Sequence, residues 1–144
     1  MTVADLIKAR TEVFSVRDDA TVHEAARYLR DRQVRSAGVL DARGRLVGVI
    51  SQSDISDKTA AENKCPAWMR VAEIMSSQLV AVPPETLLNE CVFLMEKHGI
   101  FHLLVIDAQE EYRGMISVQD LLRVIASDEK ARADMLESFL FSAR

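Results

Sequence analysis

The amino-acid sequence predicts an α+β fold: two β-α-β-β-α repeats packed on each other across a pseudo-two-fold axis, followed by a C-terminal helix. Three observations predict it. The chain has 144 residues, enough for one compact domain or for two small repeats that share a core. The sequence resembles itself at an offset of 66 residues. Helical and strand-like patterns also occur in the same order in both copies.

The internal repeat aligns residues 22–55 with residues 88–121. Eight of the 34 paired positions are identical, whereas composition alone would give about two or three. A unit of about 60 residues is only marginally stable alone. We therefore expect the two units to pack on each other through matching apolar faces. The identical pairs are Glu24/Glu90, Val39/Val105, Asp41/Asp107, Ala42/Ala108, Gly48/Gly114, Ile50/Ile116, Ser51/Ser117 and Asp54/Asp120.

Each copy is predicted to contain the same elements. A short helix comes first, then a short β-rich run, an amphipathic helix, two strands joined by a turn, and a final helix that begins at Ser51 or Ser117. Apolar residues at i, i+3, i+4 and i+7 mark the buried face of each amphipathic helix. These faces consist of Val22, Ala25, Ala26 and Leu29 in the first copy and of Leu88, Cys91, Val92 and Met95 in the second. The other segments are 3–7, 12–16, 37–40 and 46–50, matched by 71–75, 79–82, 103–106 and 112–116.

The predicted organisation is a first repeat over residues 1–60, a linker over 61–70, a second repeat over 71–127 and a C-terminal helix over 128–144. Trp68 and Met69 in the linker are expected to cover the edge of the core. The final stretch begins with a helix-start signal, Ser127-Asp128-Glu129. Its apolar strip is too large to leave in water and predicts packing on its own module or on a second copy. That strip consists of Ala131, Met135, Leu136, Phe139 and Leu140.

Composition restricts the class of protein. A net charge of −4 disfavours a nucleic-acid binder, which usually carries a basic stripe. No apolar run is long enough for a membrane span, and the N-terminus lacks a signal-peptide core. Cys65 and Cys91 lack the spacing of a zinc site, so we expect free thiols in a reducing cytoplasm. His98 and His102 have no third partner for a metal, and no nucleophile motif is present, so we expect no metal and no enzyme activity.

A Gly-x-Ile-Ser-x-x-Asp motif occurs at the same strand-to-helix junction in both copies. The first amides of a helix are unpaired, and the helix dipole favours an anion there. A serine hydroxyl at the cap adds a hydrogen bond to phosphate, and an aspartate one turn later can accept hydrogen bonds from ribose hydroxyls. The preceding glycine allows a ligand to approach the backbone closely. The motif thus predicts a phosphate-and-ribose site.

The same spacing also has a purely structural interpretation. Ser-x-x-Asp is a capping box, in which the two side chains bind the helix's own free amides. One copy alone would favour this interpretation. Two copies at equivalent positions, each with the same glycine and isoleucine, favour a ligand site.

At these motifs the sequence resembles a tandem pair of cystathionine-β-synthase (CBS) domains, a Bateman module of the stand-alone bacterial type, over about residues 2–127. The resemblance implies adenine-nucleotide binding in the cleft between the repeats, with serine on phosphate and aspartate on ribose. It also implies a basic residue just before the second strand, for which Arg35 and His102 are the candidates. Gly38 and Leu104 replace the proline that is usual in that strand. The implied nucleotide-binding residues are Gly48, Ile50, Ser51, Asp54, Gly114, Ile116, Ser117, Asp120, Arg35 and His102.

The expected function is therefore that of a non-catalytic regulatory module with no required cofactor. Its ligand would be AMP, ADP, ATP or a related adenosyl compound such as NAD, and ligand binding would shift its conformation. The resemblance further implies a homodimer. We also expect a separate regulated protein, because no catalytic or transport domain is attached in these 144 residues, and no contact with a membrane, because no apolar run is long enough. The alternative is a protein-interaction or dimerisation module without a ligand, in which both motifs only cap helices.

Overall fold

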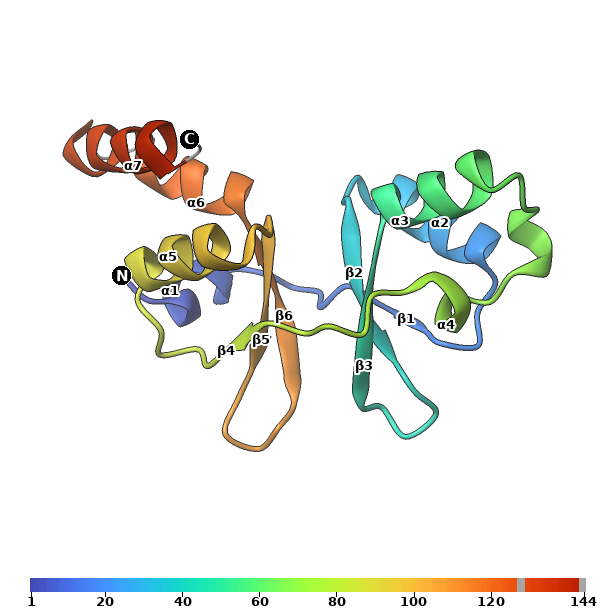
Figure 1. Cartoon of the computed structure of the whole chain (residues 1–144). Coiled ribbons are helices and arrows are strands. Elements are labelled where there is room, and N and C mark those ends of the chain that lie inside the picture. The colour runs from blue at the N-terminus through green and yellow to red at the C-terminus, as the bar shows by residue number, and fades with distance from the viewer. Residues whose placement is uncertain (127–128, 143–144) are drawn as a thin grey trace.

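Both repeats fold into a three-stranded sheet covered by helices in the computed structural model, which describes residues 1–126 and 129–142. The two sheets lie side by side, with β2 and β6 facing each other (Figure 1). The predicted α+β class is confirmed. The first sheet has the order β1-β2-β3, with β1 (Ser15–Arg17), β2 (Ser36–Leu40) and β3 (Leu46–Ser51); the second has the order β4-β5-β6, with β4 (Ala81–Val82), β5 (His102–Ile106) and β6 (Tyr112–Ser117).

Strand pairing is the same in the two repeats. The first strand of each sheet runs parallel to the second, and the second runs antiparallel to the third. A register shift between Val39 and Leu40 recurs between Val105 and Ile106. The repeat seen in the sequence thus extends to the irregularities of the sheet.

The second hairpin turn forms without a glycine. In the first turn, the Asp41 carboxylate accepts from two backbone amides, and Gly44 adopts a left-handed φ of 78°. Asp107 accepts in the same way in the second turn, where Glu110 adopts a φ of 62°. The aspartate hydrogen bonds therefore hold a left-handed residue that glycine would occupy more easily.

The long helices α2 (Val22–Arg32) and α5 (Leu88–His98) cover the two sheets. Each ends at a left-handed residue, Gln33 or Gly99, whose amide bonds back to the last turn. Such a residue is a common helix stop. The apolar faces predicted from the sequence face the cores, where Val22, Ala25, Leu29, Leu88, Cys91 and Met95 are buried.

The short helix preceding each repeat packs into the core of the other repeat. Val3 on α1 (Val3–Ile7) is fully buried in the core of the second repeat. Val71 on α4 (Val71–Ile74) is fully buried in the core of the first. Figure 1 shows α1 beside α5 and α4 beside β3. The two repeats are therefore joined by exchanged helices as well as by facing sheets.

Backbone hydrogen bonds fix this exchange. The Val3 amide donates to the Thr86 carbonyl at 2.9 Å, and the Val71 amide donates to the Ala20 carbonyl at 2.9 Å. The Val22 amide donates to the Met69 carbonyl at 2.9 Å. Each leading helix is thus bound directly to the chain just before the long helix of the opposite repeat.

The linker contains more helical structure than the sequence indicates. After α3 (Gln52–Ser56) follow a π-helical turn, η1 (Asp57–Ala61), and a 3₁₀ turn, η2 (Pro66–Trp68). Met69 is buried in the first core, as predicted. The prediction for Trp68 is wrong, because its side chain is 85% exposed. Of the two residues, only Met69 packs against the core.

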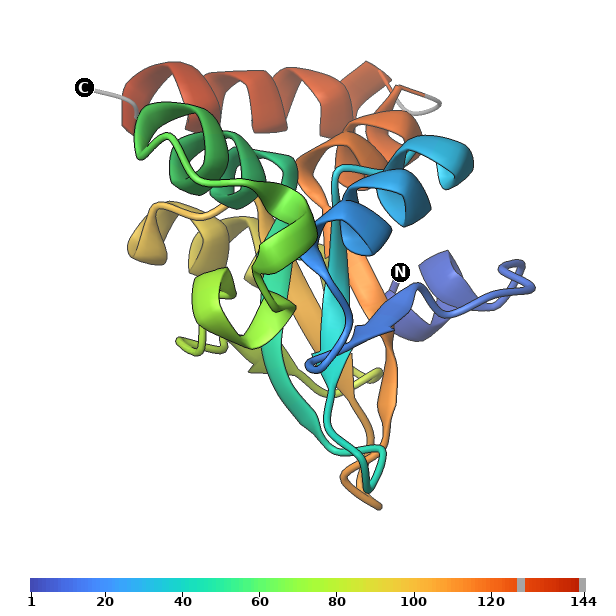
Figure 2. The same cartoon turned by 90° about the vertical axis from the view of Figure 1, so that its right-hand side faces the viewer.

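Two helices follow the second sheet, α6 (Val118–Ile125) and α7 (Glu129–Ser142). Figure 2 shows α7 running along the same side of the molecule as α2 (Val22–Arg32), α3 (Gln52–Ser56) and α6. Phe139 packs against the second core, whereas Leu136 and Leu140 are exposed. The predicted start signal at Ser127 and Asp128 lies outside the described residues. No described helix is long and apolar enough to cross a membrane.

We expect Val3→Ala and Val71→Ala each to lower the free energy of unfolding by about 2 kcal/mol, because each removes fully buried methyl groups. Chemical denaturation followed by circular dichroism measures this. Ala72→Ser, at an exposed position of α4, is the control and should change stability by less than about 0.5 kcal/mol. A Val3→Ala loss no larger than that of Ala72→Ser would contradict the exchanged packing of α1.

The two cysteines are expected to react at very different rates. Cys65 is exposed, whereas Cys91 is buried, and burial, followed by the charge of Glu90, raises the pKa of the Cys91 thiol to about 11. Thiolate is the reactive form. A thiol-specific chromogenic reagent at pH 8 should therefore label one thiol rapidly, and Cys65→Ser should abolish that phase. A rapid phase that survives Cys65→Ser would show that Cys91 is accessible.

Candidate ligand-binding cleft

A cavity of about 1410 Å³ opens between the two repeats. Its walls come from the chain segment after α1, the start of β2, the start of α3, and β6 with the N-terminal end of α6. The sheets meet here through the Ser36 hydroxyl, 3.1 Å from the Met115 sulfur. Both repeats therefore contribute to one cleft, where the family resemblance implies a ligand.

The second motif lines this cleft. Ser117 caps α6: its Oγ accepts from the Asp120 amide at 3.2 Å, and its own amide donates to Asp120 Oδ2 at 2.8 Å. Gly114 is buried with a φ of +130°, a conformation that favours glycine. Gly114, Ser117 and Asp120 all line the cavity. The predicted motif thus forms one continuous part of the cleft wall.

The first motif has the same local geometry but different surroundings. Ser51 Oγ accepts from the Asp54 amide at 3.1 Å, and Asp54 Oδ2 accepts from the Ser51 amide at 3.1 Å. Ser51 lines the cleft. Gly48 is buried against Met75, whose sulfur would lie 2.5 Å from a Cβ at this position. The first glycine therefore faces protein atoms.

Both motif isoleucines belong to the cores. Ile50 and Ile116 are fully buried and pack in the first and second core, respectively. Their side chains thus hold the strand-to-helix junctions against the two cores. The motif serines are held in place on the other side of the backbone.

An arginine that sequence reasoning missed lies against the second motif. Arg10 Nη2 forms an ion pair with Asp120 Oδ2 at 2.9 Å, and Arg10 Nη1 donates to the Met115 carbonyl. Arg10 lies after α1, far from Asp120 in the sequence. Only the exchange of α1 into the second repeat brings them together, so no local pattern could have indicated this contact.

The two predicted phosphate candidates both line the cleft. Arg35 is exposed, and His102 is half-buried. Burial lowers the pKa of His102, and the nearby Asp120 carboxylate opposes this effect only in part. Lys8 and Arg123, which sequence reasoning missed, also line the cavity. Among the described residues, no carboxylate forms an ion pair with Arg35, Lys8 or Arg123.

Tyr112 fills the space that Gly38 leaves. A Cβ at Gly38 would lie 2.7 Å from the Tyr112 ring, and the Tyr112 hydroxyl donates to the Phe14 carbonyl at 3.2 Å. Burial raises the pKa of Tyr112 to about 12, so the hydroxyl remains a neutral donor at physiological pH. At the matching place of the second sheet, Leu104 is buried. The residues at the two strand positions where the family usually has proline thus differ from each other in side-chain size.

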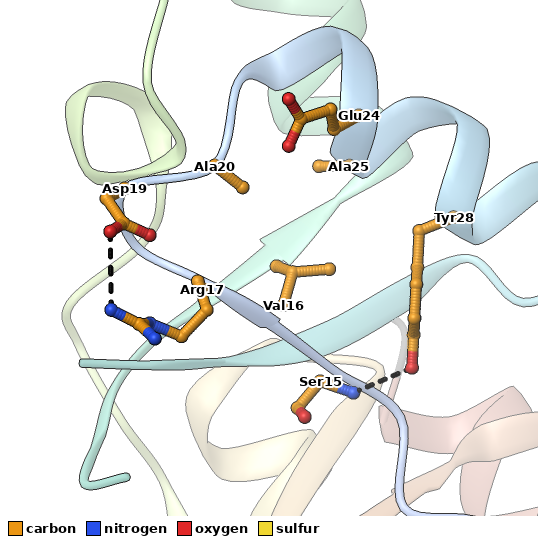
Figure 3. A pocket seen from close by; sticks show the side chains of 8 residues that line it. All are labelled: Ser15, Val16, Arg17, Asp19, Ala20, Glu24, Ala25 and Tyr28. Atoms are coloured by element: carbon orange, nitrogen blue, oxygen red, sulfur yellow. Dashed lines mark hydrogen bonds and ion pairs between the residues drawn. The ribbon is translucent and has the colours of Figure 1, made fainter. Parts of the chain in front are cut away.

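A second, smaller cavity of about 410 Å³ lies between β1 and α2 on the first repeat (Figure 3). The Ser15 amide donates to the Tyr28 hydroxyl at 3.1 Å, and Arg17 forms an ion pair with Asp19 at 3.2 Å. None of the site residues predicted from the sequence lines it. In the described part of the chain, no group of three or more His, Cys, Asp or Glu residues could hold a metal ion.

Comparison with known proteins identifies the family. The CBS domain model matches residues 3–60 and 71–127. The CBS domain-containing protein YhcV of Bacillus subtilis is 31% identical over 121 residues, which is 84% of each chain. Other curated relatives are longer. The chain spans 59% of protein MK0525 of Methanopyrus kandleri and 21% of inosine-5'-monophosphate dehydrogenase of Nitrosopumilus maritimus, at 28% and 25% identity.

Solved structures share the fold. A protein with CBS domains from Burkholderia ambifaria has a TM-score of 0.82 at 26% identity, covering 89% of this chain and 96% of that one. The CBS domain pair of protein MJ0100, crystallised with 5'-methylthioadenosine and S-adenosyl-L-methionine, has a TM-score of 0.78 at 23% identity, covering 88% and 97%. With two matched domains, two matched sheets and two matched motifs, the chain belongs to the CBS-domain family.

Proposed function

We propose that the protein is a non-catalytic regulatory module that binds an adenine nucleotide in the cleft between its two CBS repeats. The observation that carries this proposal is the cavity that Gly114, Ser117 and Asp120 line together with Arg35, Lys8 and Arg123, three basic residues for which the described part of the chain offers no ion-pair partner. Its volume of about 1410 Å³ is ample for a nucleotide. The ligands crystallised with the MJ0100 domain pair, 5'-methylthioadenosine and S-adenosyl-L-methionine, support the adenosyl part of this proposal, and the basic side chains of the cleft support the phosphate part.

Each cleft residue has a role that its chemistry suits. The Asp120 carboxylate accepts from ribose hydroxyls, as acidic residues do in other nucleotide folds. Arg35 binds phosphate, since guanidinium matches phosphate oxygens in pairs and keeps its charge. His102 supplies a further donor when protonated. The aromatic side chains of Phe101 and Tyr112, which line the cavity, provide an apolar wall for the base.

The protein signals by a shift in the populations of its conformations when the ligand binds. Ligand in the cleft contacts both repeats, so it favours the angle between them at which those contacts form. We propose that a separate protein in the cytoplasm reads this angle. AMP, ADP, ATP and NAD-like compounds all carry the adenosine and phosphate groups that the cleft fits.

A second candidate function has a specific observation in its favour. Both Ser-x-x-Asp motifs do form capping boxes, with serine and aspartate bound to each other's amides. In that case the protein is an interaction module without a ligand. A ligand screen separates the two functions, because capping alone leaves no nucleotide affinity.

We further propose a homodimer, formed through the helices of the second repeat. Apolar side chains remain exposed there on α5, α6 and α7: Phe93, Leu122, Leu136 and Leu140. Deletion of residues 128–144 followed by measurement of the mass in solution tests the part played by α7. A dimer that persists unchanged would remove that role.

We expect one adenine nucleotide to raise the melting temperature and Asp120→Asn to lower its affinity at least about tenfold, since a hydrogen bond to a charged group contributes about 1.5–3 kcal/mol. Thermal shift against AMP, ADP, ATP, NAD and S-adenosylmethionine, followed by calorimetry, measures both effects. Asparagine retains an oxygen that can accept from the Ser117 amide, so the cap survives. No shift with any compound at millimolar concentration would favour the interaction module.

Binding is also expected to depend on pH through His102. Burial holds the His102 pKa below its usual 6.5, so the imidazole is neutral at pH 7 in the free protein. A bound phosphate favours the charged form, so binding takes up a proton as pH falls below 6.5. Wild-type affinity should therefore rise, relative to His102→Gln, between pH 7.5 and 5.5. Parallel pH profiles for the two proteins would exclude a phosphate contact by His102.

A further inference from the structure

We propose that the two motifs are not equivalent: only the second binds nucleotide, and Arg10 makes that site selective for phosphorylated ligands. Arg10 forms an ion pair with Asp120 in this structure. When ribose takes Asp120, the Arg10 guanidinium transfers to the ligand's phosphate. This inference rests on the proposed function and deepens it. It specifies how many ligands bind and which adenosine compounds the cleft rejects.

The first motif is closed by backbone. The Val49 amide donates to the Ser76 carbonyl and the Ser76 amide donates to the Val49 carbonyl, both at 2.9 Å. This pair adds Ser76 to the outer edge of β3. The Ser76 carbonyl and the Met75 sulfur would lie 3.0 and 2.5 Å from a Cβ at Gly48. A ligand approaching this glycine would have to break two backbone hydrogen bonds and move a partly buried side chain.

The second motif is covered only by a side chain. Met115 occupies the position in β6 that Val49 occupies in β3, and its carbonyl accepts from Arg10 Nη1. Among the described residues other than the two neighbours of Gly114 in the chain, Arg10 Nη1, at 4.0 Å, is the only heavy atom within 4 Å of a Cβ at Gly114. A partly exposed arginine can rotate away without disturbing the backbone. The equivalent strand edge is therefore covered by hydrogen-bonded backbone in the first repeat and by a movable side chain in the second.

Arg10 occupies a hydrogen-bonding position that ribose needs. Asp120 Oδ2 already accepts from the Ser117 amide at 2.8 Å and pairs with Arg10 Nη2 at 2.9 Å. A carboxylate oxygen has about two acceptor positions, so this oxygen is saturated. Two adjacent ribose hydroxyls bind a carboxylate most directly with one hydrogen bond to each oxygen, so the favoured arrangement uses a position on Oδ2 as well as one on Oδ1. Displacement of Arg10 releases the position on Oδ2 and leaves the helix cap intact.

The displaced guanidinium determines which ligand is favoured. Loss of the Asp120 partner leaves Arg10 charged and partly desolvated, which is unfavourable. A phosphate on the same ligand replaces the lost carboxylate, and guanidinium binds phosphate through paired hydrogen bonds. Neutral adenosine offers no such replacement. A cationic adenosyl compound would in addition be repelled. Exchange of ion-pair partners therefore favours nucleotides over uncharged or positively charged adenosyl compounds.

Calorimetric titration of AMP, ATP and adenosine into wild type and Arg10→Gln tests the proposal. We expect one nucleotide per chain, and adenosine weaker than AMP by at least about tenfold in wild type. Arg10→Gln should weaken AMP and strengthen adenosine, so that the AMP-to-adenosine affinity ratio falls at least about tenfold. Arg17→Gln is the matched control. It removes an equal charge from the Arg17–Asp19 ion pair outside the cleft and should leave the ratio unchanged.

Stoichiometry provides the second readout. Asp54→Asn should retain one nucleotide per chain, whereas Asp120→Asn should abolish it or weaken it strongly. Two nucleotides per wild-type chain, or an affinity ratio that Arg10→Gln leaves unchanged, would overturn the inference while the proposed function stands. If none of AMP, ADP, ATP, NAD and adenosine binds to either wild type or Arg10→Gln, the proposed function and the inference are overturned together.

Discussion

The exchange of the two leading helices is the constraint on which the rest of the structure depends. Val3 and Val71 are fully buried in cores that consist mainly of residues from the opposite repeat. A unit of about 60 residues buries too little surface to be stable by itself. Exchange makes each core depend on the other repeat. It also requires the chain leaving α1 to cross from the second repeat to the first before β1 begins, and this crossing segment forms one wall of the cleft.

Pseudo-symmetry fails where the crossing segments meet the sheets. The segment after α4 pairs by backbone with β3, at Val49 and Ser76, whereas the segment after α1 contacts β6 through the Arg10 side chain. The equivalent strand positions 38 and 104 also differ. Gly38 has no side chain, and the Tyr112 ring lies in the space beside it, whereas Leu104 has a buried side chain of its own. Two repeats that fold alike can therefore present different surfaces to the cleft. This local difference, and not the motif itself, distinguishes the two candidate sites.

The elements within one repeat and the packing of two repeats on each other could be predicted from the sequence, whereas the individual contacts between the repeats could not. The order of helices and strands along each repeat, the buried helix faces and the starts of the helices at Ser51 and Ser117 follow from short-range periodicity and capping, and the structure has them. The contact between Arg10 and Asp120 spans most of the chain and depends on helix exchange. The predicted burial of Trp68 is wrong for a similar reason. An aromatic residue beside a buried methionine suggests burial, but the 3₁₀ turn that ends at Trp68 directs its side chain into solvent.

Capping and ligand binding are compatible uses of the same aspartate. The cap of α6 occupies one acceptor position on Asp120 Oδ2, and Arg10 occupies the other. Among the described residues, no hydrogen bond reaches Asp120 Oδ1. The helix thus fixes the orientation of the carboxylate at no cost to its remaining acceptors, and a carboxylate held in one orientation loses less entropy when a ligand binds. A capping box at this junction is accordingly an arrangement from which a binding site can be made, and whether one forms depends on what the other repeat places against it.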